Sequence, residues 1–184
     1  DLHTAYRRQR QMCIRDREIT NPVFLGIIQD MDRNMQHFSK KETKNFIVCT
    51  VPQVPEEELF SSLIARHKGK VQFIDFWATW CSGCRKTIKE YEPLKSEIGE
   101  DEVAFIYLTP SSSIEKTWKI LIEDIAGDHY WLNKEQWNYL WKQFQMTGLP
   151  MYLIIDKQGN IVKRFTHITA KELKDLLEQE INKI

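Results

Sequence analysis

The sequence predicts an α/β fold in which helices flank a mixed central sheet. From about residue 46 onward, short apolar runs alternate with amphipathic segments, which is the pattern of a layered α/β sheet. Two of the runs, residues 71–77 and 103–108, are almost wholly apolar, as expected for parallel strands covered on both faces. The last two runs flank the turn-rich loop DKQGN (156–160), which predicts a β-hairpin. We therefore expect a sheet that is parallel in its first part and ends in an antiparallel edge.

The composition argues against several classes of partner. The 184 residues include 26 Lys and Arg and 26 Asp and Glu, so the net charge is zero. This balance gives no electrostatic footprint for nucleic acid or an anionic membrane surface. No apolar run approaches the roughly 20 residues that span a bilayer. The chain begins at Asp1 without Met or a signal peptide, so we expect it to be a fragment.

The N-terminal part differs from the rest of the chain. Residues 1–20 are basic and lack an amphipathic period, and we interpret them as a non-native or disordered tail rather than a basic arm for a partner. Asn21 and Pro22 are a helix-start signal, and an apolar stripe follows them. We interpret residues 21–44 as a helical remnant of an upstream region and a linker. The main domain is then residues 45–184.

Strands and helices are expected in alternation through this domain. The six expected strands are residues 45–51, 71–77, 103–108, 129–132, 151–156 and 161–165. The first helix opens at Pro55 with three glutamates, which are favoured at a helix start, and ends near Gly69. The second helix covers residues 82–98, where Pro93 is expected to cause a kink.

Three further helices are predicted from their N-terminal signals. Ser112 and Glu115 are spaced as a capping box, which predicts a helix that extends through Ile125. Asn133 is expected to cap the next helix, and Thr169 begins a second capping box that opens the last. Residues 111–113 are thus interpreted as a cap and not as a catalytic serine cluster. Aromatic residues in and after this region are expected in the core rather than in a binding site: Trp118, His129, Tyr130, Trp131, Trp137 and Trp141.

Of the four cysteines, only Cys81 and Cys84 are closely spaced. They follow the carboxyl end of the 71–77 strand, where sites form in open α/β sheets, and they begin a helix. The Cα atoms of residues i and i+3 of a helix lie about 5–6 Å apart, a separation that a disulfide can bridge. The first sulfur faces free backbone N–H groups and the positive end of the helix dipole, with Arg85 and Lys86 nearby, so the thiolate is favoured. These features predict that Cys81 attacks a disulfide of a partner and that Cys84 resolves the mixed disulfide.

Three other interpretations of the cysteine pair compete with a redox function. A structural zinc site needs four ligands, but Cys13 and Cys49 are isolated, and His67 and His129 are unpaired in the sequence. A purely structural disulfide would close a very small loop and restrain the unfolded chain little. The third interpretation, that both are incidental core cysteines, does not explain why they follow the end of a strand where sites form. We therefore expect no metal.

Asp75 lies inside the apolar 71–77 run. On a strand it shares one face with Phe73 and Trp77, and burial there would raise its pKa. It could take the proton from Cys84 through a water molecule as that thiol becomes a nucleophile. An exposed edge position or a structural hydrogen bond is the open alternative.

Two segments resemble landmarks of the thioredoxin superfamily. FIDFWATWCSGC (73–84) is similar to its active-site segment, with a buried acid, a tryptophan and CxxC. TGLPMYLIIDKQG (147–159) is similar to its second landmark, a proline before the hairpin strand. The resemblance covers residues 45–184 and implies a thioredoxin-like fold. It implies Cys81 as nucleophile, Cys84 as resolving thiol and Asp75 as proton carrier. It also implies substrate binding by Trp80, by the Leu149 backbone and by Pro150, with Pro150 in the cis form and packed against the dithiol.

The chain departs from a minimal thioredoxin in two additions, a β-α extension at 45–67 and a central insert near 110–135. This expanded pattern resembles the TlpA/ResA-like thiol-disulfide oxidoreductases. The resemblance implies a periplasmic or cell-envelope location, a role in redox homeostasis and possible anchoring through a missing N-terminal segment. Ser82 and Gly83 replace the Gly-Pro of typical thioredoxins, which leaves the direction of electron flow open.

We therefore predict a thiol-disulfide oxidoreductase whose cofactor is its own Cys81–Cys84 disulfide. Its partners would be disulfide-containing proteins and a dithiol electron donor. One alternative is a non-catalytic thioredoxin-like binding module. Another is a thiol peroxidase, although Thr79-Trp80-Cys81 does not match the threonine spacing that this class needs.

Overall fold

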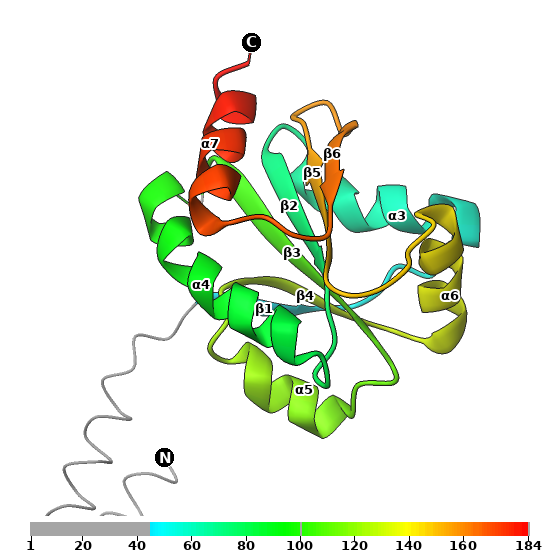
Figure 1. Ribbon diagram of the computed structural model, residues 1–184. Coiled ribbons are helices and arrows are strands. Elements are labelled where there is room, and N and C mark those ends of the chain that lie inside the picture. Colours follow the sequence, from blue (N-terminus) through cyan, green and yellow to red (C-terminus); the bar gives the residue numbers. More distant parts are fainter. Residues whose placement is uncertain (1–44, 100, 184) are drawn as a thin grey trace, which may run out of the picture. The chain divides into compact units, whose positions relative to one another are not determined.

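The computed structural model describes residues 45–99 and 101–183 (Figure 1). Expectations for residues 1–44 lie outside these described residues. The strands are β1 (Phe46–Cys49), β2 (Val71–Phe76), β3 (Val103–Pro110), β4 (Gly127–Leu132), β5 (Met151–Ile155) and β6 (Ile161–Phe165). The helices are α3 (Glu56–Ile64), the 3-10 helix η1 (Ala65–His67), α4 (Ser82–Ile98), α5 (Glu115–Ile122), α6 (Lys134–Gln143) and α7 (Ala170–Ile181).

The six strands form one mixed sheet in the order β1-β4-β3-β2-β5-β6. The first four strands in this order run parallel, and β5 and β6 pair antiparallel with β2 and with each other. The expected α/β fold with a parallel part and an antiparallel hairpin is confirmed. The extension and the insert meet at one side of the sheet, because β1 pairs with β4 there.

Strand β2 lies in the centre of the sheet, and all six of its residues are buried. Because side chains alternate along a strand, its residues contribute to two separate cores. Phe73 and Trp77 belong to the core under α4, α5 and α7, whereas Ile74 and Phe76 belong to the core under α3 and α6. Figure 1 shows these two groups of helices on opposite sides of the sheet. The side chains of β2 are thus held in the packed interior on both faces of the sheet.

Two of the three predicted helix caps are confirmed. Asn133 and Thr169 each accept a hydrogen bond from the backbone three residues on, and each belongs to a complete capping box. The predicted box from Ser112 to Glu115 is wrong. Helix α5 has Ile114 at its N-cap position, without a side-chain cap. The serine hydroxyls bond elsewhere, as described below.

The insert also departs from the prediction in its boundaries. Helix α5 ends at Ile122 rather than extending through Ile125. The chain then turns into β4, which begins at Gly127, two residues before the expected strand. Gly127 has a φ of 130°, and a Cβ there would lie 2.5 Å from the carbonyl oxygen of Phe105. A glycine is therefore needed where β4 enters the sheet against β3.

The aromatic residues of the insert and of α6 pack in the core as expected. Trp118, His129 and Tyr130 are buried, and Trp131, Trp137 and Trp141 are partly buried against the two cores.

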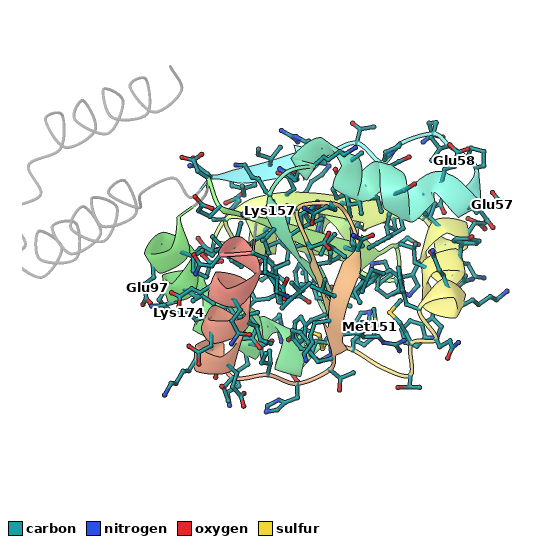
Figure 2. All side chains as sticks on the ribbon, turned by 90° about the horizontal axis from the view of Figure 1, so that it is seen from above. Glu57, Glu58, Glu97, Met151, Lys157 and Lys174 are labelled. Atoms are coloured by element: carbon teal, nitrogen blue, oxygen red, sulfur yellow. A yellow bond between two sulfur atoms is a disulfide. The ribbon has the colours of Figure 1, made fainter. Side chains whose placement is uncertain are left out.

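On the surface, the ammonium of Lys174 on α7 donates a hydrogen bond to the carboxylate of Glu97 on α4 at 2.6 Å, and the two side chains lie side by side in Figure 2. Within the described residues, no helix is long and apolar enough to cross a membrane.

Candidate active site

Cys81 and Cys84 are joined by a disulfide at the carboxyl end of β2, with their Cα atoms 5.3 Å apart. Cys81 is the N-cap of α4 and is partly exposed, and its sulfur accepts a hydrogen bond from the Cys84 N–H at 3.1 Å. Cys84 is fully buried in the core under α4. One sulfur can thus meet a partner, while the other is shielded behind it.

Asp75 is fully buried in β2, between its neighbours Tyr107 on β3 and Tyr152 on β5. It lies on the strand face that carries Phe73 and Trp77, which is also the face that α4 and Cys84 cover. The alternative that Asp75 lies at an exposed edge is wrong, because β2 is a central strand.

Neither carboxyl oxygen of Asp75 has a hydrogen-bond partner among the described residues. Burial therefore raises the pKa of Asp75 well above its ordinary value, and the Lys95 ammonium lowers it by a smaller amount. Burial likewise raises the pKa values of Tyr107 and Tyr152, so both phenols stay protonated. Asp75 is a buried acid able to take up and release a proton.

Lys95 is a site residue that the sequence analysis missed. It is buried on α4, pairs with Glu92 and donates a hydrogen bond to the carbonyl oxygen of Ala126. Its ammonium lies 4.8 Å from the centre of the Tyr107 ring and 5.2 Å from that of Phe105. The signal was present in the sequence, because Lys95 continues the helical stripe of Cys84, Ile88 and Tyr91 at i, i+4, i+7 and i+11.

The second landmark meets the same end of the sheet. The Leu149–Pro150 peptide bond is cis, as the resemblance implied. Pro150 directly precedes β5, and Met151 pairs with Phe76 at the end of β2. In this register, Pro150 lies opposite the segment that follows Phe76 and leads to Cys81.

Trp80 precedes Cys81 and is the most exposed aromatic of the site, with 61% of its surface accessible. Its indole N–H donates to the hydroxyl of Ser112 at 3.3 Å. An exposed ring fixed beside the outer cysteine is suited to contact a partner. The sequence analysis interpreted Ser112 as a helix cap, but in the structure its hydroxyl contacts Trp80.

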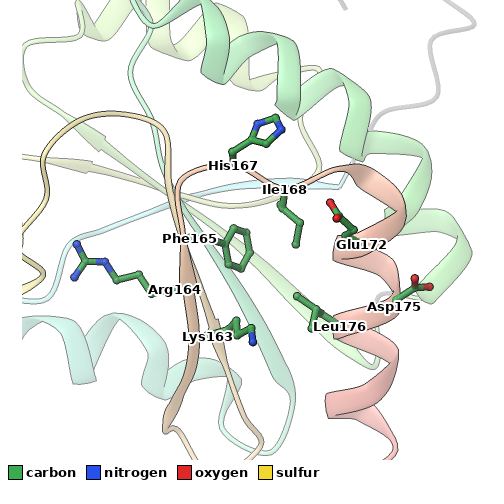
Figure 3. Close-up of a pocket in the computed structure, with 8 residues that line it drawn as sticks. All are labelled: Lys163, Arg164, Phe165, His167, Ile168, Glu172, Asp175 and Leu176. Carbon is green, nitrogen blue, oxygen red and sulfur yellow. The ribbon is translucent and has the colours of Figure 1, made fainter.

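A free thiol and a hollow elsewhere in the described residues lie apart from the cysteine pair. Cys49 is a half-buried free cysteine on β1, and burial raises its pKa. A hollow of about 400 Å³ lies between β6 and α7, where Phe165 and Leu176 form an apolar wall (Figure 3). None of the predicted site residues lines it. No group of three His, Cys, Asp or Glu side chains in the described residues could hold a metal ion.

The site combines a cysteine pair that forms a disulfide at a helix start, a buried acid on the strand below it and a cis-proline at the same end of the sheet. Together these features define a class of protein. It is the class of thiol-disulfide oxidoreductases built on a thioredoxin-like sheet. The comparisons with known proteins agree. Residues 63–181 match the family model of the thioredoxin-like domain, so the chain belongs to this family.

The relatives narrow the class further. The chain is 24% identical over 147 residues to the thiol-disulfide oxidoreductase ResA of Bacillus thuringiensis subsp. konkukian, covering 78% of this chain and 77% of that protein. The thioredoxin domain of a thiol-disulfide oxidoreductase from Bacteroides vulgatus has the same fold, with a TM-score of 0.58 and 21% identity, over 65% of this chain and 84% of that one. An exposed lipoprotein thioredoxin from Streptococcus pneumoniae also shares the fold, with a TM-score of 0.51 and 21% identity, over 63% and 89% of the two chains. The chain is a TlpA/ResA-like member of the thioredoxin superfamily and a thiol-disulfide oxidoreductase.

Proposed function

We propose that Cys81 is the attacking thiol and Cys84 the resolving thiol in disulfide exchange with other proteins. The observation that carries this proposal is the asymmetry of the pair. Cys81 is partly exposed at the start of α4 and accepts the Cys84 N–H, whereas Cys84 is fully buried. A sulfur that faces a helix start is favoured as thiolate, which is the form that attacks disulfides.

In the reducing direction the exchange takes two steps. The Cys81 thiolate attacks one sulfur of the partner's disulfide, forms a mixed disulfide and releases the other partner sulfur as a thiolate, which takes up a proton. Cys84 then loses its proton and attacks the sulfur of Cys81, so that the second partner thiol is released. The partner gains two electrons and two protons, and Cys81 and Cys84 end as a disulfide.

Asp75 is proposed as the acceptor of the Cys84 proton. It lies on the face of β2 that α4 and Cys84 cover, and its pKa is raised by burial. A base with a raised pKa holds the transferred proton better than an ordinary carboxylate would, and transfer through one water molecule is within the reach of such catalysis. Returning the proton to solvent resets the site.

Trp80, Leu149 and Pro150 are proposed to bind the partner. Trp80 offers an exposed ring next to Cys81. The Leu149 backbone directly precedes the cis-proline and comes before the first paired residue of β5, so its peptide groups are placed to bond an extended segment of the partner.

We further propose that the pair works without another cofactor, because the disulfide itself carries two electrons. A dithiol protein would return it to the reduced form. We place the protein in the cell envelope, in redox homeostasis, and the description of one structural neighbour as an exposed lipoprotein supports this place. Cell fractionation with an antibody against the chain would test the location and any anchoring.

Insulin reduction tests the proposed function. The wild-type chain is expected to catalyse it with a dithiol donor, and Cys81→Ser and Cys84→Ser are each expected to be at least about 100-fold slower. Cys49→Ser is the matched control, since Cys49 lies on β1 outside the site, and it should keep the wild-type rate. Wild-type turnover no faster than that of the two site variants would overturn the proposal.

A further inference from the structure

The bonds between β2 and β3 follow a regular series toward the site. The N–H of Val71 donates to the carbonyl of Glu102 at 3.2 Å. At the other end of the strand, the N–H of Trp77 donates to the carbonyl of Leu108 at 3.1 Å. In a parallel ladder, every second residue of a strand donates to the same neighbour, so the next donor is the N–H of Thr79.

Ser113 interrupts this series and replaces its next acceptor. The same register would direct the Thr79 N–H to the carbonyl of Pro110, but that carbonyl accepts the N–H of Ser113 at 2.9 Å. The Thr79 N–H donates instead to the hydroxyl of Ser113 at 3.0 Å. The backbone N–H of Ser113 thus occupies the Pro110 carbonyl, and the side chain of Ser113 replaces that carbonyl as the acceptor for the Thr79 N–H.

This side chain fixes the backbone immediately before the nucleophile. Thr79 is two residues from Cys81, and the Cys81 N–H donates to the carbonyl of Ala78 at 3.0 Å. The Ser113 side chain is fully buried, so water cannot take over its bond. The Ser113 hydroxyl thus ties the backbone two residues before Cys81 to the turn that follows β3.

The neighbouring serine acts on the other exposed group of the site. The hydroxyl of Ser112 accepts the indole N–H of Trp80, although most of that ring is in solvent. The turn that carries both serines is itself held from β4, because the indole N–H of Trp131 donates to the Ser113 carbonyl at 3.2 Å. The insert thus reaches the cysteine pair through two hydroxyls.

Helix capping does not account for these serines. Serine is favoured as an N-cap, and Ser112 with Glu115 has the spacing of a capping box. In the structure Ile114 occupies the N-cap position without a side-chain cap. The two hydroxyls are used toward the site instead.

We propose that Ser112 and Ser113 are positioning residues of the redox site. Ser113 sets the backbone that presents Cys81, and Ser112 sets the ring of Trp80 that a partner meets. The proposal builds on the proposed function of the site, but it can be tested in the reduced protein without any turnover.

The first test is the alkylation of Cys81 in the reduced full chain. Its rate with iodoacetamide is followed from pH 5 to 9 by peptide mass spectrometry, which separates Cys81 from the other cysteines. Ser113→Ala is expected to slow the reaction at neutral pH by about tenfold, because a displaced Cys81 sulfur loses the N–H groups at the start of α4 that favour its thiolate, the form that reacts. Ser113→Thr keeps the hydroxyl and is expected to restore most of the rate.

Two matched variants separate positioning from general loss of a hydroxyl. Ser61→Ala removes a hydroxyl that bonds within α3, and Thr109→Val removes a buried hydroxyl that has no partner among the described residues. Both are expected to keep the wild-type alkylation profile. The role of Ser113 is overturned if Ser113→Ala also keeps that profile, or if Ser113→Thr is as slow as Ser113→Ala.

Amide hydrogen exchange gives a second test of Ser113 that needs no variant. The N–H of Thr79 lies beyond the end of β2, yet it is expected to exchange as slowly as the N–H of Trp77. Exchange at the rate of an open loop would overturn the role of Ser113. This measurement decides the question even if Ser113→Ala does not fold.

Ser112 is tested through the mobility of Trp80. Acrylamide quenching is measured with and without Trp80→Phe, and the difference isolates this ring. Ser112→Ala is expected to raise the quenching of Trp80 about twofold, because the ring loses the hydrogen bond that its indole N–H donates to Ser112. Ser112→Thr is expected to leave the quenching unchanged. Equal quenching in all three proteins would overturn the role of Ser112. A failure of wild-type insulin reduction would remove the proposed function but leave all three tests readable.

Discussion

Asp75 is a residue that packing alone does not explain. Its carboxyl group lies fully buried between two tyrosines, and neither oxygen has a hydrogen-bond partner in the described part of the chain. A buried polar group without partners costs stability and calls for a reason. The proton transfer that we propose between Cys84 and Asp75 would supply this reason, because α4, which carries Cys84, covers the same face of β2.

Replacing Asp75 tests this reason through stability. Because burial raises the pKa of Asp75, the stability that its proton contributes is present below the ordinary pKa of 3.8 and is lost as pH rises through the raised pKa. Asp75→Asn cannot ionise, so unfolding by urea should show a smaller loss of stability as pH rises from 4 to 9. Each pKa unit by which folding raises the pKa of Asp75 corresponds to about 1.4 kcal/mol in the free energy of unfolding. The same pH dependence in both proteins would show that Asp75 is not a desolvated acid.

The same variant has a kinetic signature. Without a proton acceptor, Cys84 should become a nucleophile more slowly, by about 100-fold. Quenched-flow mixing of the reduced protein with a disulfide substrate separates the formation of the mixed disulfide at Cys81 from its later release by Cys84. The initial attack by Cys81 serves as the internal control and should be nearly unchanged. An unchanged release rate would exclude Asp75 as the proton carrier.

Most strands and helices were predictable because their signals are local. The apolar run of β2, the caps at Asn133 and Thr169, and the loop between β5 and β6 each lie within a few residues of the element they define. Ser112 and Ser113 were misassigned for the opposite reason. Their partners at residues 79 and 80 are far along the chain, and only the pairing of β2 with β3 brings the two segments together.

At the scale of elements, β4 carries a buried histidine, His129, from which we predict a loss of stability in acid. His129 stacks on Tyr107 with ring centres 4.8 Å apart, and its Nε2 bonds the carbonyl of Ile125. Burial lowers the pKa of His129 from 6.5 to about 4. Its stabilising contribution is therefore complete above pH 6.5 and is lost as pH falls toward 4.

His129→Phe is expected to flatten this acid loss, which amounts to about 3 kcal/mol between pH 7 and 4. The phenyl ring can keep the stack on Tyr107, although the bond to Ile125 is lost. Urea unfolding across this pH range measures the effect, with the exposed His167→Gln as control. If the variant and the wild type lose stability in parallel, His129 is not the acid-sensitive group.

Gly127 tests how the insert enters the sheet. Gly127→Ala is expected to lower the free energy of unfolding by about 2–3 kcal/mol, because it combines a positive φ with a clash against the Phe105 carbonyl. Gly159→Ala is the matched control, since it also has a positive φ but nothing within 4 Å of a new Cβ. Equal losses in the two variants would mean that the close approach of β3 and β4 is not limiting.

At the scale of the whole molecule, the sheet separates two cores and gathers the site at one end. The central acid of β2, the start of α4 and the approach to β5 meet there, and the insert adds its serine turn. The order of the strands was not predictable, because nothing local shows that β4 lies between β1 and β3. Lys95 was missed for a different reason: it continues the buried stripe of α4, but a lysine on a helix is usually exposed. The cysteine pair, its acid and the proline were predictable because two short motifs contain them.

Trapping of the mixed disulfide tests the division of labour between the cysteines most directly. Cys84→Ser and Cys81→Ser are each reduced and mixed with oxidised insulin, and the products are separated on a non-reducing gel and mapped by mass spectrometry. We predict that Cys84→Ser accumulates a disulfide between Cys81 and an insulin chain, while Cys81→Ser accumulates none. Adducts on Cys84 in the Cys81→Ser protein, or none in either variant, would contradict the account.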